Sequence, residues 1–301
     1  DPTSYHGEPT YMRAIYSRFP IQVSGNTITM DFYQLSKAID LYNYFDGNGV
    51  AADTQIVSDN TIYANVGYTN TEDYPLIGIR NGSCCGTDSR TIVVENNTVN
   101  AIGMHRSLIA IKQDGSNFDG SINVLNNTTS FNAYPFVNCS SPWSNEFYAA
   151  LDIAINNVNV VGNTFTGSGT GIYIPSANSY SNIVIDSNYI EAQQAHTAQS
   201  VWGGQNTVTI DDDYHYGIYA PSSENIFIRH NTIKTESGTV VYQSGGASII
   251  KYNLLESWDG RGLHVENQAG TEFSSNTITS LSQNGGDFGI HVSNLSAPAI
   301  K

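Results

Sequence analysis

The sequence is poor in charge, in sulfur and in long apolar runs. Charged residues make up 13% of its 301 residues, and there are only three cysteines and three methionines. No stretch approaches the roughly 20 consecutive apolar residues that a membrane-spanning helix needs, so we expect no membrane insertion. Twelve Lys and Arg stand against 27 Asp and Glu, a net charge of −15. Such an acidic chain argues against nucleic acid and anionic membrane surfaces as partners.

The abundant residues are aromatic and uncharged polar ones. The chain holds 19 Tyr and 27 Gly, with many Asn, Ser and Thr. Disordered chains usually lack aromatic and β-branched residues, so we expect an ordered fold. The acidic, lysine-poor and Asn/Thr-rich composition suits the cell exterior, and we therefore expect an extracellular or cell-surface location.

A short phrase recurs along the chain: alternating apolar residues, a polar residue, then Asn followed by Thr or an apolar residue. It reads QVSGNTITM near the start and IFIRHNTIKT further on. The closest copies are 22 or 23 residues apart, which defines the bare repeat, and wider spacings add a loop. The anchoring asparagines are Asn26, Asn60, Asn97, Asn127, Asn163, Asn188, Asn231, Asn253 and Asn276.

A second phrase follows most of these anchors, for example GIYIPS at 171–176 and GLHVEN at 262–267. It alternates apolar with other residues, which is typical of a strand with one buried face. Each repeat therefore carries two or three short strands, separated by corners rich in Asn and Gly.

Such repeats predict a solenoid, because one turn of about 22 residues cannot bury its apolar face alone, whereas stacked turns share a core. Equivalent residues would lie about 4.8 Å apart, so nine turns give a rod of roughly 43 Å. Asn suits a repeated corner, since it tolerates left-handed backbone and its amide can bond the amides above and below. We predict an all-β fold, a single-stranded parallel β-helix of about nine turns. A β-sandwich with Asn-Gly turns would not require the same corner residue nine times.

The IxxNxI phrase resembles the parallel β-helix repeat of the pectate-lyase-like superfamily. That superfamily includes NosD-type surface proteins, polysaccharide lyases and epimerases, and phage tailspikes. The resemblance covers about residues 20–295 and implies a right-handed helix, the usual hand of parallel crossovers. It implies little about activity, because function lies in sites grafted on the fold.

The predicted domains are an N-terminal extension over 1–20 and a β-helix domain over 21–301, with an insertion loop at about 192–214. One segment departs from the repeat. In residues 33–45, Leu35, Ala38, Ile39 and Tyr42 have helical spacing. We expect a short amphipathic helix there that caps the N-terminal end of the solenoid and covers its strand edges.

Aligning the second phrase by its apolar residues predicts an outward column on one sheet. Its later rings could support a sugar chain, although an alternative remains that tyrosine simply decorates a strand face. The neighbouring column begins with Arg80 and Lys112 and later includes Glu266. The first column consists of Gly78, Ala110, Ala154, Tyr173, Tyr219, His264 and His291.

The acidic insertion is a second candidate site, because long loops on rigid scaffolds often carry function. Asp211, Asp212 and Asp213 precede His215. Three alternatives remain: a Ca²⁺ site, a source of acid and base for glycosidic cleavage or β-elimination, or a solvated acidic turn. Further candidates for the same groove, beside His264, are Asp259, Arg261 and Glu266.

The resemblance does not extend to catalytic motifs. Polygalacturonase-like hydrolases carry Asn-Thr-Asp, an Asp pair, Gly-His-Gly and Arg-Ile-Lys, of which only an Asp pair is present. The Asp-Pro-His-Glu signature of mannuronan epimerases is absent as well. Lyases of the superfamily use Lys or Arg as base, and the candidates Arg106, Lys112 and Arg261 lie in different turns. The net charge favours a neutral glycan over a polyanion.

Cysteine and asparagine offer covalent sites. Cys84 or Cys85 can bridge to Cys139 if their Cα atoms lie within about 6 Å, and the third thiol can link subunits; the alternative is three reduced thiols. Glycosylation sequons are candidates at Asn81, Asn138 and Asn294. Further sequons occur at Asn96, Asn126 and Asn127.

Three functional hypotheses remain open. The first is an extracellular non-catalytic β-solenoid, a glycoprotein that serves as a cell-surface, filament or adhesin subunit and contacts glycan. The second is a polysaccharide-active enzyme, a lyase, glycoside hydrolase or epimerase, that uses the outer groove. The third is a phage or viral tailspike domain that binds glycan. The expected partners are a glycan or further copies of the chain. No cofactor is expected beyond a Ca²⁺ ion in the acidic insertion.

Overall fold

The structure is a computed structural model. Among the residues that it describes, all helices and strands that were assigned are β-strands. None of these residues forms a helix of the length and apolarity that a membrane crossing requires. The described residues are 12–32, 36–45, 54–66, 75–83, 89–103, 107–115, 118–132, 149–176, 179–193, 216–266, 270–281, 289–293 and 299–300.

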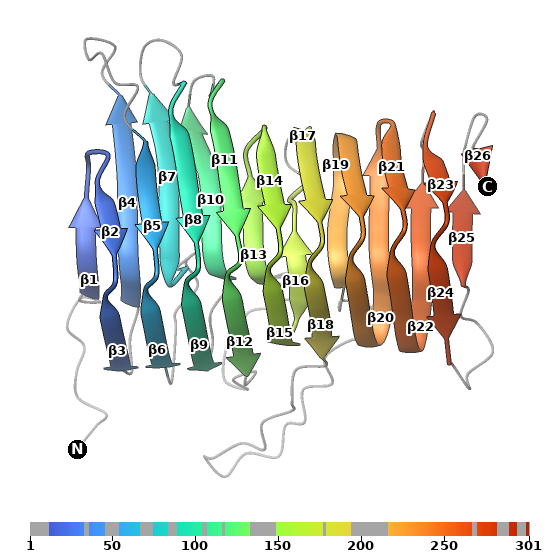
Figure 1. The fold of residues 1–301 in the computed structure, drawn as a ribbon, viewed down its shortest axis with the longest axis horizontal. Helices are drawn as coiled ribbons and strands as arrows, with labels where there is room; N and C mark the ends of the chain where they lie inside the picture. Colours follow the sequence, from blue (N-terminus) through green and yellow to red (C-terminus); the bar gives the residue numbers. More distant parts are fainter. Residues whose placement is uncertain are drawn as a thin grey trace, which may run out of the picture.

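The strands wind into a parallel β-helix in which each turn adds one strand to each of three sheets (Figure 1). We call these sheets 1, 2 and 3 in their order within each turn, counting from the strand that precedes the recurrent asparagine. The recurrent asparagine lies between sheets 1 and 2. Each strand pairs in parallel with the equivalent strands of the turns before and after it, as β11 does with β8 and β14.

The strands of the three sheets have the following bounds. Sheet 1 holds β2 (Gln22–Ser24), β5 (Gln55–Ser58), β8 (Thr91–Glu95), β11 (Ser121–Leu125), β14 (Val158–Val161), β17 (Ser181–Asp186), the second part of β19 (Tyr216–Arg229), β21 (Ser248–Lys251), β23 (Glu272–Ser274) and β26 (Ala299–Ile300). Sheet 2 holds β3 (Thr27–Phe32), β6 (Thr61–Val66), β9 (Thr98–Gly103), β12 (Thr128–Asn132), β15 (Thr164–Ser168), β18 (Tyr189–Gln193), the first parts of β20 (Thr232–Gly245) and β22 (Leu254–Glu266), and β24 (Thr277–Ser280). Sheet 3 holds β1 (Met12–Ser17), β4 (Ser36–Phe45), β7 (Ile77–Ser83), β10 (Ser107–Gly115), β13 (Ala149–Ala154), β16 (Thr170–Tyr173), the first part of β19, the second parts of β20 and β22, and β25 (Ile290–Ser293).

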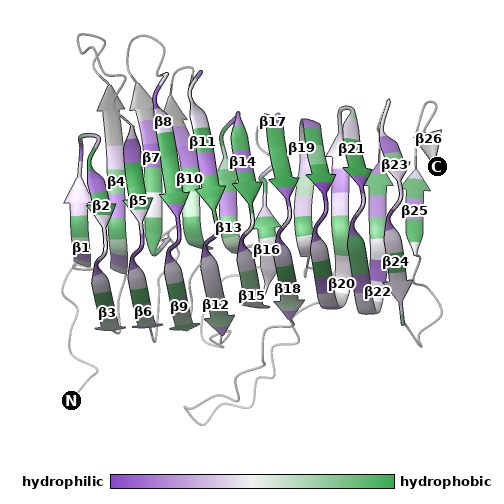
Figure 2. Cartoon of the chain, viewed as in Figure 1, coloured by the Kyte–Doolittle hydropathy of each residue, from purple (hydrophilic) through white to green (hydrophobic). Residues whose placement is uncertain are grey.

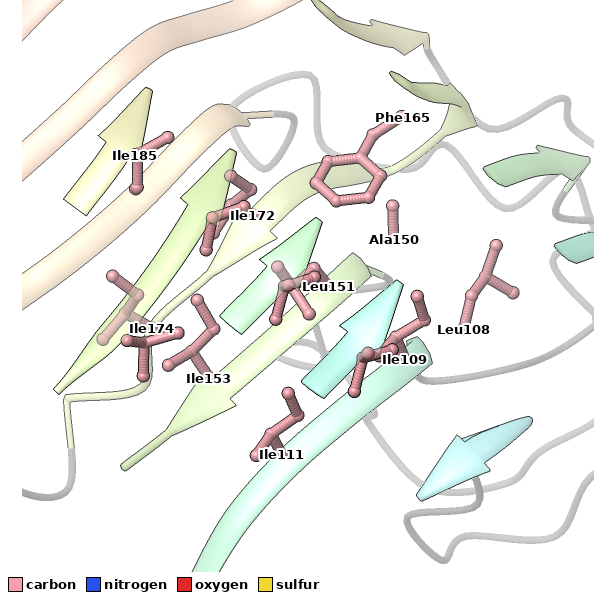
Figure 3. Packing of buried hydrophobic residues seen from close by; sticks show 14 of the residues in the cluster. Leu108, Ile109, Ile111, Ala150, Leu151, Ile153, Phe165, Ile172, Ile174 and Ile185 are labelled. Carbon is pink, nitrogen blue, oxygen red and sulfur yellow. The ribbon is translucent and has the colours of Figure 1, made fainter. Parts of the chain in front are cut away.

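The core is a set of apolar columns inside the three sheets. In sheet 3, Ile109 pairs with Leu151 and Leu151 with Ile172, and all three side chains are fully buried (Figure 3). Hydropathy alternates along the strands, and bands of one kind continue from strand to strand (Figure 2). Successive side chains along a strand therefore point alternately into the core and outward, as they do in a sheet with one buried face.

A ladder of asparagine side chains runs along the corner between sheets 1 and 2. Asn127 illustrates the pattern: its backbone N and its Nδ2 both donate to Oδ1 of Asn163, at 2.8 and 3.0 Å. Its Nδ2 also donates to the carbonyl oxygen of Val94 in the preceding turn, at 2.8 Å. The side chain of Asn127 is fully buried, so the ladder satisfies polar groups that would otherwise be costly inside the molecule.

The residue before each ladder asparagine has left-handed backbone. Two of these positions are glycine, and the others are Asn, Asp, Ser, His or Tyr. Asn and Asp visit this conformation readily, whereas bulky residues such as His230 and Tyr252 rarely do. The positions, with φ between 52° and 69°, are Gly25, Asp59, Asn96, Asn126, Gly162, Ser187, His230, Tyr252 and Ser275.

The N-terminal region differs from the sequence-based prediction in two respects. No helix lies within the described part of 33–45; residues 36–45 form β4, which pairs with β1 on one side and β7 on the other. The buried Ile39 and Leu41 are two residues apart, as in a strand. Pairing with two neighbouring strands stabilises the extended conformation more than the helical spacing of four residues favours a helix. Because β1 already belongs to sheet 3, the solenoid also includes residues assigned to an N-terminal extension.

Candidate functional site

An outward column of aromatic rings lies on sheet 3 in the C-terminal half of the solenoid. Each member is the register partner of the next, from β16 through β19, β20 and β22 to β25. The tyrosines and His291 are partly exposed, whereas His264 is 6% exposed. We call this set the aromatic column; it consists of Tyr173, Tyr219, Tyr242, His264 and His291.

The rings of the aromatic column stack on one another. The ring centroids of Tyr173 and Tyr219 are 5.7 Å apart at 15°, and those of Tyr219 and Tyr242 are 5.1 Å apart at 14°. Tyr242 meets His264 edge to face at 5.0 Å, and His264 stacks on His291 at 4.4 Å. Tyr216 packs beside the column, 4.6 Å from Tyr219. The parallel register of the solenoid thus converts aromatic residues far apart in the sequence into one continuous strip.

Polar side chains surround His264 near the C-terminal end of the aromatic column. Glu266 Oε2 accepts a hydrogen bond from the Tyr242 hydroxyl at 3.2 Å, and its Oε1 lies 2.8 Å from His264 Nε2. On the other side of the imidazole, Arg261 Nη1 lies 3.4 Å from His264 Nδ1. Because a guanidinium can only donate, Nδ1 accepts, and the neutral imidazole carries its proton on Nε2, facing Glu266.

The environment shifts the titration of two members of this group. Burial lowers the pKa of His264 and outweighs the nearby Glu266 carboxylate, which raises it; His291 and Arg261 lower it further. Burial also raises the pKa of Tyr242, and the negative charge of Glu266 adds to the effect. A neutral imidazole, a neutral phenol and a carboxylate therefore face one another, an arrangement that can exchange protons with a bound molecule.

Toward the N-terminus the same register positions of sheet 3 hold Asp152, Ala110, Gly78 and Asp40. Asp152 is the partner of Tyr173 and is almost fully buried, and Lys112 Nζ lies 3.1 Å from its Oδ2. Further along, Asp40 is bound by Lys37 Nζ at 3.1 Å and by Arg13 Nε at 2.8 Å. Burial lowers the pKa of Lys37 despite the neighbouring Asp40. These carboxylates are already paired with cations, which favours a structural role for this half of the column.

The structure confirms most of the predicted column and corrects one member. Gly78 and Ala110 pair as expected, but Ala110 is the partner of Asp152, and Ala154 instead pairs with Lys112. The cause is that an alternating pattern looks the same after a shift of two residues. Arg80 and Lys112 are register partners, as predicted. Glu266 pairs with Ser244 on one side and with Ser293 on the other.

Tyr242, the central ring of the column, was not predicted from the sequence. Its strand reads VVYQS, which does not match the copies of the second phrase in the other turns. A signal was present, since Tyr242 follows Asn231 by the same number of residues as His264 follows Asn253. Counting from the asparagine anchor, rather than matching apolar residues, would have identified it.

Several predicted site residues lie outside the described residues. They are Cys84, Cys85, Arg106, Asn138, Cys139, Asp211, Asp212, Asp213, His215 and Asn294. The described part of the chain contains no cluster of three or more His, Cys, Asp and Glu side chains that could hold a metal ion.

The described sequons differ in access. Asn81 is 4% exposed within β7 and Asn127 is fully buried in the ladder, so a glycan on either would require a strand to open. Asn96 and Asn126 are exposed at the left-handed corner, where a glycan can be accommodated. The fold therefore separates sequons that the sequence alone treats alike.

Comparison with known protein families identifies the class of protein that this fold defines. The family model described as right handed beta helix region matches residues 144–300, more than half of the chain and all of the aromatic column. The chain belongs to this family, which confirms the predicted right-handed parallel β-helix. Comparison with curated proteins and with solved structures gives no match.

Proposed function

We propose that this protein is an extracellular β-helix that binds a neutral glycan along the aromatic column. The observation that carries the proposal is the stack formed by Tyr173, Tyr219 and Tyr242, whose rings are nearly parallel and partly exposed. Offset stacking leaves part of each ring face and the hydroxyl edge available, a combination of apolar surface and hydrogen-bonding groups that suits sugars.

The length of the aromatic column fits an oligosaccharide chain rather than a single sugar. From Tyr173 to His291 the column crosses five successive turns, about 19 Å at a spacing of 4.8 Å per turn. Several sugar units in a row can therefore contact rings at once. We expect longer oligosaccharides to bind more tightly than short ones because each further contact adds to the same complex.

The charge of the molecule supports an uncharged ligand. The net charge is −15, and the carboxylate of Glu266 lies beside His264 at the C-terminal end of the aromatic column. A polyuronate would meet like charge there and over the surface as a whole. A neutral polysaccharide avoids this repulsion.

Affinity gel electrophoresis with neutral and acidic polysaccharides tests the proposal. We expect retardation by at least one neutral polymer, and about a fivefold weaker interaction for Tyr219→Ala, because stacking of this kind is worth about 1 kcal/mol. Phe227→Ala is the matched control, since Phe227 is 36% exposed on sheet 1, away from the column. Equal retardation of the two variants, or none with any neutral polymer, would contradict the proposal.

A second function, cleavage of the bound glycan, is favoured by the group around Glu266. The Tyr242 hydroxyl lies 3.2 Å from one carboxylate oxygen of Glu266, and His264 Nε2 lies 2.8 Å from the other. General acid–base catalysis needs such a pair of groups, one to deliver and one to remove a proton. This candidate corresponds to the polysaccharide-active enzyme among the sequence-based hypotheses.

Reducing-end release distinguishes hydrolysis of the neutral glycan from simple binding. We expect Glu266→Gln to abolish this release while leaving polysaccharide retardation unchanged. If the Glu266→Gln variant still releases product, or if no polymer that binds is cleaved, binding alone remains the function of the column.

A structural role at the cell surface is compatible with the same site. We propose that the solenoid presents the aromatic column as a cell-surface, filament or adhesin subunit, consistent with its acidic, Asn/Thr-rich composition. Electron microscopy of the protein from its native source tests this: filaments or a regular lattice are expected. Dispersed particles would contradict it, and side-by-side trimers would favour the tailspike hypothesis.

A further inference from the structure

A groove of about 510 Å³ lies on sheet 2 in the N-terminal half of the molecule. It crosses β3, β6, β9 and β12, which lie next to one another in Figure 1. The aromatic column begins at β16 on sheet 3 and shares no strand with the groove. Its volume is within the range of about 300–1,000 Å³ that is typical of small-molecule sites.

The groove combines one exposed aromatic ring with apolar surface. Tyr63 is 48% exposed and Ile102 is 46% exposed, although large apolar side chains elsewhere on the described strands are mostly inside the core. Between them the lining contains Ala64 and Ala101, which are register partners and whose side chains point into the core, at 4% and 3% exposure, so neither side chain stands in front of the sheet. A ring-shaped ligand with an apolar face can lie against Tyr63.

Apart from Met30, the rest of the lining consists of side chains that donate and accept hydrogen bonds without carrying charge. Asn100 is the register partner of Tyr63 on one side and of Ser130 on the other, and Asn65 and Asn132 flank Ile102 in the same way. A carboxamide offers an acceptor and two donors in one plane, which suits adjacent hydroxyl groups. Among the described residues that line the groove, none is Asp, Glu, Lys, Arg or His.

From this chemistry we infer that the groove is a second carbohydrate site, which takes a neutral mono- or disaccharide. An ionised ligand would lose hydration without gaining a counter-charge, and a purely apolar ligand would leave the amides facing carbon. The inference is independent of the aromatic column. If both sites bind sugar, the molecule is bivalent and can connect two glycan chains or gain avidity on one.

Saturation-transfer NMR can detect the weak binding expected for a single sugar. The probes are methyl glycosides of glucose, galactose, mannose and N-acetylglucosamine, with glucuronate, galacturonate and cyclohexanol as comparisons. The starting protein is the Tyr219→Ala variant, because it removes the middle ring of the Tyr173–Tyr219–Tyr242 stack in the aromatic column. We expect signal from at least one neutral glycoside, and a much weaker signal from the uronates and from cyclohexanol.

Two variants locate the signal. Adding Tyr63→Ala or Asn100→Ala to Tyr219→Ala is expected to weaken binding about tenfold, since each removes a stacking or hydrogen-bonding contact. Tyr252→Ala is the matched control, because Tyr252 is 52% exposed at the corner between sheets 1 and 2. Unfolding curves check that each variant folds, and both groove positions are outward-facing, so little loss of stability is expected.

The outcomes separate this inference from the proposed function. Binding that survives Tyr219→Ala but is lost on adding Tyr63→Ala supports the second site. Binding that is unaffected by Tyr63→Ala, or equal for cyclohexanol and the glycosides, overturns it. The absence of signal from every neutral glycoside overturns it too, while polysaccharide retardation that depends on Tyr219 would leave the aromatic column in place.

Discussion

At the scale of single residues, the left-handed corner shows what one position in each turn must tolerate. Six residue types occupy the nine equivalent positions there, and their φ angles agree within a narrow range. Gly25 and Gly162 have nearly the same φ, 68° and 69°, but different surroundings. A Cβ on Gly25 would meet nothing within 4 Å, whereas a Cβ on Gly162 would lie 2.5 Å from Oδ1 of Asn126.

This pair of glycines separates backbone strain from steric conflict. We expect Gly25→Ala to lower the free energy of unfolding by about 1–2 kcal/mol, the cost of left-handed backbone for a residue with a Cβ. Gly162→Ala should cost more, because Asn126 must also move. Urea unfolding followed by circular dichroism measures both changes. Equal losses would show that the Asn126 side chain gives way freely.

The burial of His264 predicts a dependence of stability on pH. Its pKa is lowered in the folded chain, chiefly by burial, so the unfolded chain binds the proton more readily. The stability is therefore kept above the unfolded pKa of about 6.5 and is lost progressively as the pH falls below it. Urea midpoints measured from neutral pH to about pH 5 should fall less for His264→Gln than for the wild type. Identical slopes would refute this assignment to His264.

At the scale of elements, the asparagine ladder joins the turns through buried side chains. Asn163 donates to the carbonyl oxygen of Val124 at 2.8 Å and to Oδ1 of Asn188 at 2.9 Å. Its own Oδ1 accepts from both the backbone N and the Nδ2 of Asn127. Removing this side chain therefore takes hydrogen bonds from Val124 and Asn127 in the turn before it and from Asn188 in the turn after it.

We expect Asn163→Ala to lower the free energy of unfolding by more than about 3 kcal/mol, because each buried group left without a partner costs about 1–3 kcal/mol. Asn26→Ala, at the N-terminal end of the ladder, should cost about 1 kcal/mol, since Asn26 is partly exposed and has a ladder neighbour on one side only. Chemical denaturation of the two variants gives the comparison. Similar losses would mean that ladder position does not matter.

At the scale of the whole molecule, the groups that stabilise the fold differ from the groups that set its electrostatic field. The solenoid is held by uncharged groups, the apolar columns and the asparagine ladder, while the net charge of −15 acts through the field around the molecule. The half of sheet 3 that carries Lys37, Asp40, Lys112 and Asp152 pairs its charges internally. The half that carries the aromatic column presents rings instead.

This separation predicts how salt affects binding. Affinity for a neutral polysaccharide should change little between low and high sodium chloride, because no ion pair forms across the interface. An acidic polysaccharide should bind less well at low salt, where repulsion by the acidic surface is least screened. Gel retardation across a salt series tests both statements. Loss of neutral-polymer binding with salt would point to charged contacts instead of ring contacts.

The repeat, the parallel pairing and the nine ladder asparagines could be predicted from the sequence, because each turn repeats the same local pattern of alternation and corner residue. The outward placement of Tyr173, Tyr219, His264 and His291 followed from that pattern as well. Non-local contacts decided the rest. Residues 36–45 are a strand because β1 and β7 flank them, and no local spacing reveals those neighbours.

Tertiary structure also decided which residues share a column and how buried they are. A period-two pattern is unchanged by a shift of two residues, so only backbone pairing could place Asp152, rather than Ala154, next to Tyr173. The same pairing set Tyr242 between Tyr219 and His264. The sequence by itself determined which faces of the strands point inward, because alternation is local. The partner of each outward side chain depends on register between turns, and register is set by contacts between residues far apart in the chain.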